Sequence, residues 1–102
     1  MFLAVAIDTP LRRTFDYRVP SGTARLPEPG MRVRVPFGRR RVIGIVLECR
    51  AHSEVPASKL RTIDATLDEE PVLDQHLLQL LRWAADYYRH PIGEVLATAL
   101  QA

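Results

Sequence analysis

Apolar and polar residues alternate along the first half of the chain in the way that β-strands require. Residues 2–7 (FLAVAI) form an apolar run without alternation, which predicts a short strand buried on both faces. Residues 14–19 (TFDYRV) and 31–35 (MRVRV) alternate with period two. Residues 42–47 complete a predicted hairpin around a basic turn at 39–41, and Gly44 within them marks a bulge or a close backbone approach.

The second half changes from strand-like to helical patterning. Residues 60–67 predict one further short strand. Asp74 is a good N-cap for a helix whose apolar positions recur at helical spacing. This helix is expected to end at His90, because a residue before proline is pushed out of the α region, and a second helix is expected over residues 92–100.

Strands first and helices last predict an α+β fold: a small antiparallel, barrel-like (OB-like) sheet followed by a C-terminal helical pair. The 102 residues correspond to one domain, with strands mainly in 1–68 and helices in 72–102. Cys49 is the only cysteine, so an intrachain disulfide and a cysteine-based zinc site are excluded. No apolar run reaches the length of a membrane span, and a cytoplasmic protein is expected.

Charge divides the chain into two halves. Residues 1–50 hold ten arginines against four acids, a net charge of +6, whereas residues 51–102 carry a net charge of −4. A basic first half predicts one surface for an anionic partner. Preference for arginine over lysine can reflect genomic bias, but such bias does not explain the separation into halves.

Candidate catalytic chemistry is sparse. The three histidines lie in different contexts, and the acidic run at 68–70 precedes Pro71, where a solvated turn is expected. The glycines at 30, 38 and 44 are isolated and form no phosphate-binding motif. The sequence therefore predicts a binding domain without its own active site.

Aromatic residues among arginines are typical of single-strand nucleic-acid binding, which needs cations for phosphates and flat faces for bases. Phe15, Tyr17 and Phe37 lie among the arginines of the first half. Core burial of each aromatic is the alternative. In the helical half, the spacing of Leu80, Trp83 and Tyr87 predicts core packing, and exposure toward a neighbouring domain is the alternative.

Six segments in this order closely resemble the N-terminal domain of the bacterial primosomal protein N′ family, the PriA replication-restart helicases. They are residues 10–17 (PLRRTFDY), 30–38 (GMRVRVPFG), 43–46 (IGIV), 67–71 (LDEEP), 83–88 (WAADYY) and 91–96 (PIGEVL). The resemblance implies a domain that binds the 3′-hydroxyl terminus of DNA at stalled forks, largely without regard to base.

The resemblance also implies that this chain is a fragment of a longer ATP-dependent 3′→5′ DNA helicase. ATP, magnesium and zinc are implied for that full-length protein, and no cofactor is expected in this fragment. Implied partners are DNA with a free 3′ end, forked DNA and, through the full-length protein, single-strand-binding protein and other primosome proteins. A general single-strand or RNA-binding barrel and a protein-interaction module docking through the Trp83 helix are the alternatives.

The family's terminal-nucleotide pocket falls on Phe15 and Asp16, with Tyr17 beside them, and on Gly38. The family's lysine falls on Arg61, a departure that keeps the charge and changes the geometry; Lys59 could share the role. In this interpretation Asp16 accepts a hydrogen bond from the hydroxyl and Phe15 packs against the base or sugar. A phosphate is held by Arg61 with Arg39 or Arg40. Since strand alternation sends Phe15 and Asp16 to opposite faces, the strand end must twist or lie at a rim.

Overall fold

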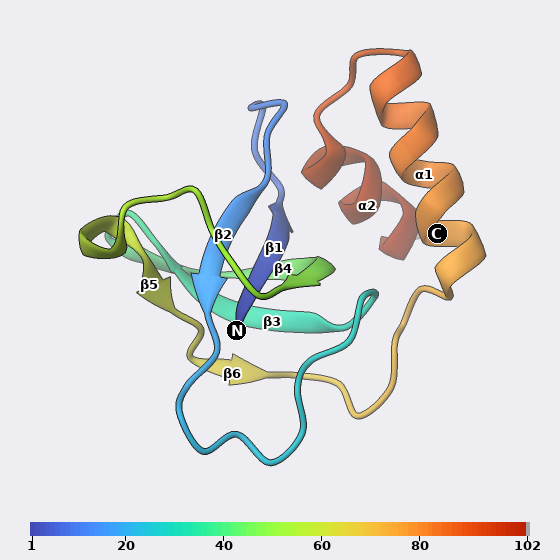
Figure 1. Cartoon of the computed structure of the whole chain (residues 1–102). Helices are drawn as coiled ribbons and strands as arrows, with labels where there is room; N and C mark the ends of the chain where they lie inside the picture. Colours follow the sequence, from blue (N-terminus) through green and yellow to red (C-terminus); the bar gives the residue numbers. More distant parts are fainter. Residues whose placement is uncertain (102) are drawn as a thin grey trace.

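The computed structural model describes residues 1–101, with the strands first and the helices last (Figure 1). The predicted α+β, OB-like class is confirmed. The elements are β1 (Phe2–Ile7), β2 (Phe15–Arg18), β3 (Arg32–Phe37), β4 (Arg40–Arg50), the 3₁₀ helix η1 (Ala57–Lys59), β5 (Arg61–Thr62), β6 (Ala65–Thr66), α1 (Gln75–Tyr87) and α2 (Ile92–Gln101).

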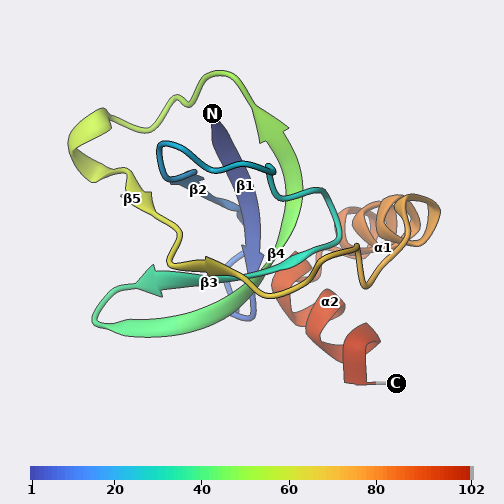
Figure 2. The ribbon, with the colours of Figure 1, turned by 90° about the horizontal axis from the view of Figure 1, so that it is seen from below.

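The six strands form one sheet in the order β5-β2-β1-β4-β3-β6. All neighbours pair antiparallel except β2 and β5, which are parallel. The edge strands β5 and β6 are separated in the chain by only Ile63 and Asp64, so the sheet must curl until its edges approach. The Ile63 amide donates to the Arg18 carbonyl and the Asp64 amide to the Arg34 carbonyl, which bridges the gap. Figure 2 shows the resulting half-barrel, with both helices outside it on one side.

Both faces of the sheet carry a hydrophobic core, and β1 contributes to each, as its uninterrupted apolar run predicts. The inner core fills the half-barrel, and the outer core joins the sheet to the helices. The inner core consists of Leu3, Val5, Ile7, Tyr17, Val33, Val35, Val46 and Ile63, and the outer core of Ala6, Ile45, Leu47, Leu73, Leu78 and Leu96.

Two glycines allow the close contacts of β1 with its neighbours. A Cβ on Gly44 would overlap the Val5 side chain, so the predicted close approach in β4 is confirmed. A Cβ on Gly93 would overlap the backbone carbonyl of Ile7, so this glycine lets α2 lie directly against the end of β1. The helical layer is therefore held at a short distance from the sheet.

The predicted starts of both helices are confirmed, whereas α1 ends at Tyr87, three residues before the predicted end at His90. The Asp74 carboxylate caps α1 by accepting a hydrogen bond from the Leu77 amide at 2.8 Å. After α1, Arg89 adopts a positive φ of 55°, and α2 begins directly after Pro91. Within residues 1–101, neither helix has the length and apolar character needed to cross a membrane.

Two predictions of strand boundaries are also wrong. Residues 60–67 form two strands of two residues each, β5 and β6, because the segment leaves β2 and crosses to β3 after Thr62. The hairpin turn lies at Gly38 and Arg39, since Phe37 already pairs with Arg40, and β4 extends to Arg50. Arginine side chains thus belong to the strand as well as to the turn.

Candidate nucleic-acid interface

A pocket of about 270 Å³, hereafter the Asp16 pocket, opens where β2 begins. Three separate segments form its wall: the start of β2, the β3–β4 turn, and the stretch from η1 into β5. Six residues predicted from the resemblance line this pocket: Phe15, Asp16, Tyr17, Gly38, Lys59 and Arg61. Since β2 starts at Phe15, the pocket lies at the rim of the half-barrel, where consecutive residues of a strand can both reach it.

Strand pairing brings the stretch from η1 into β5 to the rim of the half-barrel. Parallel β5 places Arg61 opposite Tyr17. An Arg61 Nη then donates to the Gly38 carbonyl at 2.8 Å, so residues 23 positions apart meet across the pocket. The Arg18 guanidinium donates to the Ala57 carbonyl at 3.1 Å and fastens η1 to β2.

Aromatic rings form the apolar wall of the pocket. Phe15 and Phe37 meet edge to face, with their ring centroids 5.0 Å apart. The guanidinium of Arg13 lies 4.8 Å from the Phe15 ring centroid, within cation–π range. Phe15 and Phe37 are only half-buried, so part of each remains open to a ligand. This combination suits the sugar or base of a nucleotide next to its phosphate.

The Asp16 carboxylate is nearly buried and is held from one side. The Ser53 hydroxyl donates to Oδ2 at 2.6 Å, and the Ser53 Oγ accepts from the Val55 amide at 3.1 Å. An Arg50 Nη lies 3.6 Å from Oδ1. A carboxylate has about four acceptor positions, so these contacts leave capacity for a further donor. An adjoining hollow of about 590 Å³ lies on the Ser53 side, so Asp16 borders two depressions.

Gly38 keeps the turn side of the pocket open. Its φ of +60° lies in the left-handed region that favours glycine, and no atom stands within 4 Å of the position that a Cβ would take. The backbone conformation therefore favours glycine at this position, which lines the pocket.

Tyr17 forms the floor of the pocket. Its side chain is buried in the inner core, and its hydroxyl donates to the Pro36 carbonyl at 2.7 Å. Burial raises the pKa of the Tyr17 phenol, and the nearby Arg61 charge opposes that rise. Tyr17 therefore supports the pocket from below as a neutral side chain.

The cations differ in how firmly they are held. Arg61 is tied to the turn, whereas the Lys59 ammonium makes no hydrogen bond or ion pair within residues 1–101. Arg39 and Arg40 are exposed on the β3–β4 turn and strand and do not line the pocket, so the structure does not bring them together with the other six.

The sequence predicted Phe37 as a stacking candidate without placing it in the terminal-nucleotide pocket, and it did not place Arg13 or Ser53 there either. Arg13 and Phe37 stand inside segments that carried the resemblance, and their position beside Phe15 and Gly38 was the available signal. Ser53 reaches Asp16 from 37 residues away, out of an irregular loop without a local pattern.

The predicted core packing of the aromatic stripe on α1 is wrong. Leu80, Trp83 and Tyr87 are 59%, 58% and 65% exposed, because the helix instead buries the opposite stripe at Leu78 and Ala85. The rings of Trp83 and Tyr87 stack on each other at 5.1 Å. An apolar face of α1 is therefore open.

Comparison with known proteins identifies the family of this chain. Residues 4–101 match the family model of the PriA 3′DNA-binding domain (3′BD). The chain is 42% identical over 96 residues to the replication restart protein PriA of Haemophilus influenzae, covering 94% of the chain and 13% of that protein. It is 33% identical to PriA of Bacillus subtilis, covering 83% of the chain and 11% of that protein. It is 39% identical to the probable PriA of Mycobacterium tuberculosis, covering 90% and 14%. The chain thus spans about an eighth of the relatives that it matches.

Proposed function

Because the chain belongs to the family of PriA 3′ DNA-binding domains, we propose that its Asp16 pocket binds the last nucleotide of a DNA strand that ends in a free 3′-hydroxyl. The observation that carries this proposal is a nearly buried carboxylate beside two half-buried phenylalanine rings and three cations in one pocket. Such a set matches the parts of a terminal nucleotide: hydroxyl, base or sugar, and phosphate.

Asp16 recognises the 3′-hydroxyl at the end of the strand. Its carboxylate accepts a hydrogen bond from the 3′-hydroxyl, and its negative charge repels a 3′-phosphate. The Ser53 hydrogen bond holds Oδ2 in place, so the carboxylate meets the terminal hydroxyl in a fixed orientation. Phe15 offers a face that any base or sugar can use, which explains binding without regard to base identity.

Phosphate contacts come from Arg61 and Lys59. Arg61 is already positioned by the Gly38 carbonyl and retains guanidinium donors for a phosphate oxygen. Lys59 acts as a freely placed point charge. Arg39 and Arg40 contribute to the electrostatic field outside the pocket and do not contact the terminal nucleotide.

The proposal extends to a longer protein, since the chain covers 13% of the Haemophilus influenzae relative. There this domain would target an ATP-dependent 3′→5′ helicase to stalled forks in the cytoplasm. Residues 1–101 bring together no group of three or more His, Cys, Asp or Glu side chains that could hold a metal ion. ATP, magnesium, zinc and contacts with primosome proteins and single-strand-binding protein are proposed for the complete protein.

The test is fluorescence anisotropy with short labelled strands ending in a 3′-hydroxyl, a 3′-hydrogen or a 3′-phosphate. The domain should prefer the hydroxyl by roughly tenfold or more, as expected for a hydrogen bond to a charged group. Asp16→Ala should abolish the preference over both blocked ends. Asp16→Asn should mainly abolish the preference for a 3′-hydroxyl over a 3′-phosphate.

Asp8→Ala is the matched control, because Asp8 is an exposed carboxylate that does not line the pocket. Equal binding of all three ends by the unmodified domain would overturn end recognition and favour a general single-strand surface. Retained preference in Asp16→Ala would remove Asp16 from its assigned role.

A second candidate function is protein docking through α1, which the open stripe of Leu80, Trp83 and Tyr87 favours. This function predicts that Trp83→Ala leaves DNA binding unchanged. Failure of the domain to bind any DNA probe would move docking to first place.

A further inference from the structure

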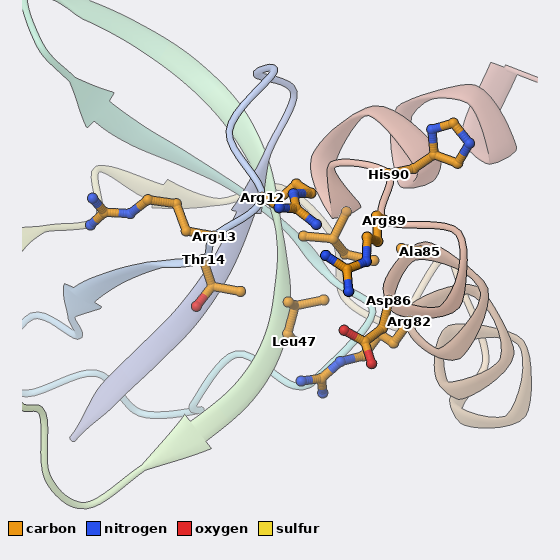
Figure 3. A pocket seen from close by; sticks show the side chains of 10 residues that line it. Arg12, Arg13, Thr14, Leu47, Arg82, Ala85, Asp86, Arg89 and His90 are labelled. Atoms are coloured by element: carbon orange, nitrogen blue, oxygen red, sulfur yellow. The ribbon is translucent and has the colours of Figure 1, made fainter.

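A second pocket of about 270 Å³, hereafter the basic pocket, lies between the half-barrel and the helices. Arg12 and Arg13 enter it from the loop before β2, and Arg82 and Arg89 enter it from α1 and the turn that follows. Figure 3 shows the Arg12 and Arg89 side chains directed toward the same space, with Leu47 and Ala85 behind them. Cationic side chains from two layers of the fold, Arg12 and Arg89, therefore approach one another, whereas the Arg13 side chain is directed away from them (Figure 3).

The basic pocket has an excess of positive charge. Asp86 is the only carboxylate that lines it, and within residues 1–101 Asp86 forms no ion pair. Arg82 contacts Glu48 at 3.4 Å, whereas Arg12, Arg13 and Arg89 make no ion pair within the described chain. Converging guanidinium groups repel one another, so an anion between them would lower the electrostatic energy.

The backbone at Arg89 adds an independent observation. Its φ of +55° is a conformation that glycine or asparagine usually occupies at this place after a helix. The turn is fastened by hydrogen bonds from the Arg89 amide to the Asp86 carbonyl and from the His90 amide to the Ala85 carbonyl. An arginine held at an unfavourable backbone angle, with its side chain in a pocket, is typical of a functional position.

Arg13 lines both the basic pocket and the Asp16 pocket. A cationic path therefore leads from the predicted terminal-nucleotide site toward Arg12 and Arg89. Among the described residues, the lining of the basic pocket includes no Phe, Tyr or Trp, and the ring of His90 is directed away from Arg12 and Arg89 (Figure 3), so the pocket offers mainly charge and guanidinium donors. These are the features of backbone-phosphate binding without base contact.

We propose that the basic pocket binds a backbone phosphate of the DNA strand whose 3′-terminal nucleotide occupies the Asp16 pocket. This proposal rests on the proposed function for the direction of the strand. It adds a second DNA contact, which forms only when the helices pack against the barrel. This contact strengthens binding and does not depend on the chemical group at the 3′ end.

The experiment measures the dissociation constant against salt concentration for a dinucleotide and a 12-nucleotide strand, each with a 3′-hydroxyl. The double variant Arg12→Gln/Arg89→Gln should reduce the log–log slope for the 12-nucleotide strand by about 0.7 for each phosphate that the variant no longer binds. The dinucleotide slope and the preference for 3′-hydroxyl over 3′-phosphate should not change. Arg89→Gly should also weaken binding of the 12-nucleotide strand. Glycine accepts the positive φ at this position, so this variant should stay folded.

Arg25→Gln/Arg34→Gln is the matched control, because it removes the same charge from exposed arginines outside both pockets. If the log–log slope decreased equally in this control, net charge alone would explain the decrease, and the proposal would be overturned. Loss of end preference in the Arg12/Arg89 variant would also overturn it, because the two pockets would then act as one.

A titration with inorganic phosphate followed by ³¹P NMR separates a small-anion site from a DNA site. Saturable phosphate binding that requires Arg12 and Arg89, with unchanged DNA slopes, would contradict a DNA role. Should the unmodified domain bind all 3′ ends equally, the proposed function would fail, and the slope comparison would still test the basic pocket.

Discussion

The Asp16 pocket and the basic pocket have the same volume, about 270 Å³, but differ in origin and chemistry. The first belongs to the half-barrel alone and combines a carboxylate, aromatic rings and cations. The second spans the barrel and the helices and offers mainly guanidinium groups. In our two proposals, the Asp16 pocket discriminates between end groups because it holds a carboxylate beside cations, whereas the basic pocket only attracts phosphate because it holds mainly like charges.

Their supports differ as well. The Asp16 carboxylate is restrained by Ser53, and Arg61 by the Gly38 carbonyl. In the basic pocket, Arg12 and Arg89 have no such side-chain hydrogen bonds within residues 1–101. A preorganised site can reject a wrong end group, whereas mobile cations adapt to any phosphate.

The largest expected effect comes from separating the layers that form the basic pocket. Gly93→Ala inserts a methyl group against the Ile7 carbonyl and should cost about 1–3 kcal/mol. Thermal melting should show a Tm lower by roughly 4–8 °C for each kcal/mol. In the cold, where the domain stays folded, binding of a 12-nucleotide strand should lose the part of its salt dependence that the basic pocket supplies and keep its preference for a 3′-hydroxyl. Thr98→Ala, on the exposed side of α2, is the control; loss of end preference in Gly93→Ala would contradict the independence of the pockets.

Removing the aromatic wall should affect one pocket only. Phe15→Ala should weaken binding of strand ends by about 1–3 kcal/mol, roughly five- to 150-fold, with every base affected alike. Phe15→Leu preserves burial and loses the ring face, so it should weaken binding similarly without loss of Tm. Anisotropy titrations measure both. If Trp83→Ala weakened binding more than Phe15→Ala, the stacking surface would lie on α1.

The same comparison explains how far the sequence could predict this molecule. Period-two alternation at Val33 and Val35 identified strand residues whose side chains enter the inner core, because one buried face requires that pattern. Helical periodicity was less informative, since α1 carries two apolar stripes and only the one at Leu78 is buried. Because α1 packs mainly against α2, the buried stripe depends on tertiary packing that the periodicity of α1 alone does not encode.

Some residues of the candidate site could likewise be predicted from the sequence, whereas others could not. Asp16 and Gly38 could be predicted because each stands in a recognisable local segment. The Ser53 contact and the meeting of Arg12 with Arg89 depend on how distant segments pack, and no local pattern encodes them. Side chains that position or supplement a site are therefore visible only in the folded molecule.

A smaller effect is expected from loosening the carboxylate while keeping it in place. Ser53→Ala removes the hydrogen bond to Asp16 Oδ2 and leaves Arg50 as the side chain that restrains the carboxylate. The preference for 3′-hydroxyl over 3′-phosphate should fall by about five- to tenfold, near 1 kcal/mol. Binding of the phosphate-ended strand should not weaken.

Ser53→Thr retains the hydroxyl and should restore the preference, which a change in loop structure alone would not explain. Since Ser53 does not line the basic pocket, the salt slope should match that of the unmodified domain. A selective change in that slope would argue that the loop joins both pockets.

The smallest effect on DNA binding is expected at Asp68, which lines neither pocket. Its carboxylate accepts from the Arg32 amide at 2.8 Å and forms an ion pair with the Arg32 side chain at 2.8 Å. These contacts lower the pKa of Asp68 below its usual value of 3.8. The folded state therefore binds this proton less tightly than the unfolded state, so the stabilisation is present above about pH 4 and is lost as pH falls through the folded pKa.

Asp68→Asn should lower the free energy of unfolding at pH 7 by on the order of 1 kcal/mol, because Arg32 is partly exposed and solvent screens the pair. The difference from the unmodified domain should shrink as pH falls below about 4, and urea titrations between about pH 2.5 and 7 measure it. DNA affinity and end preference at pH 7 should remain unchanged. A change in either would mean that the β3–β6 edge, like the rim and the helical layer, positions a DNA contact.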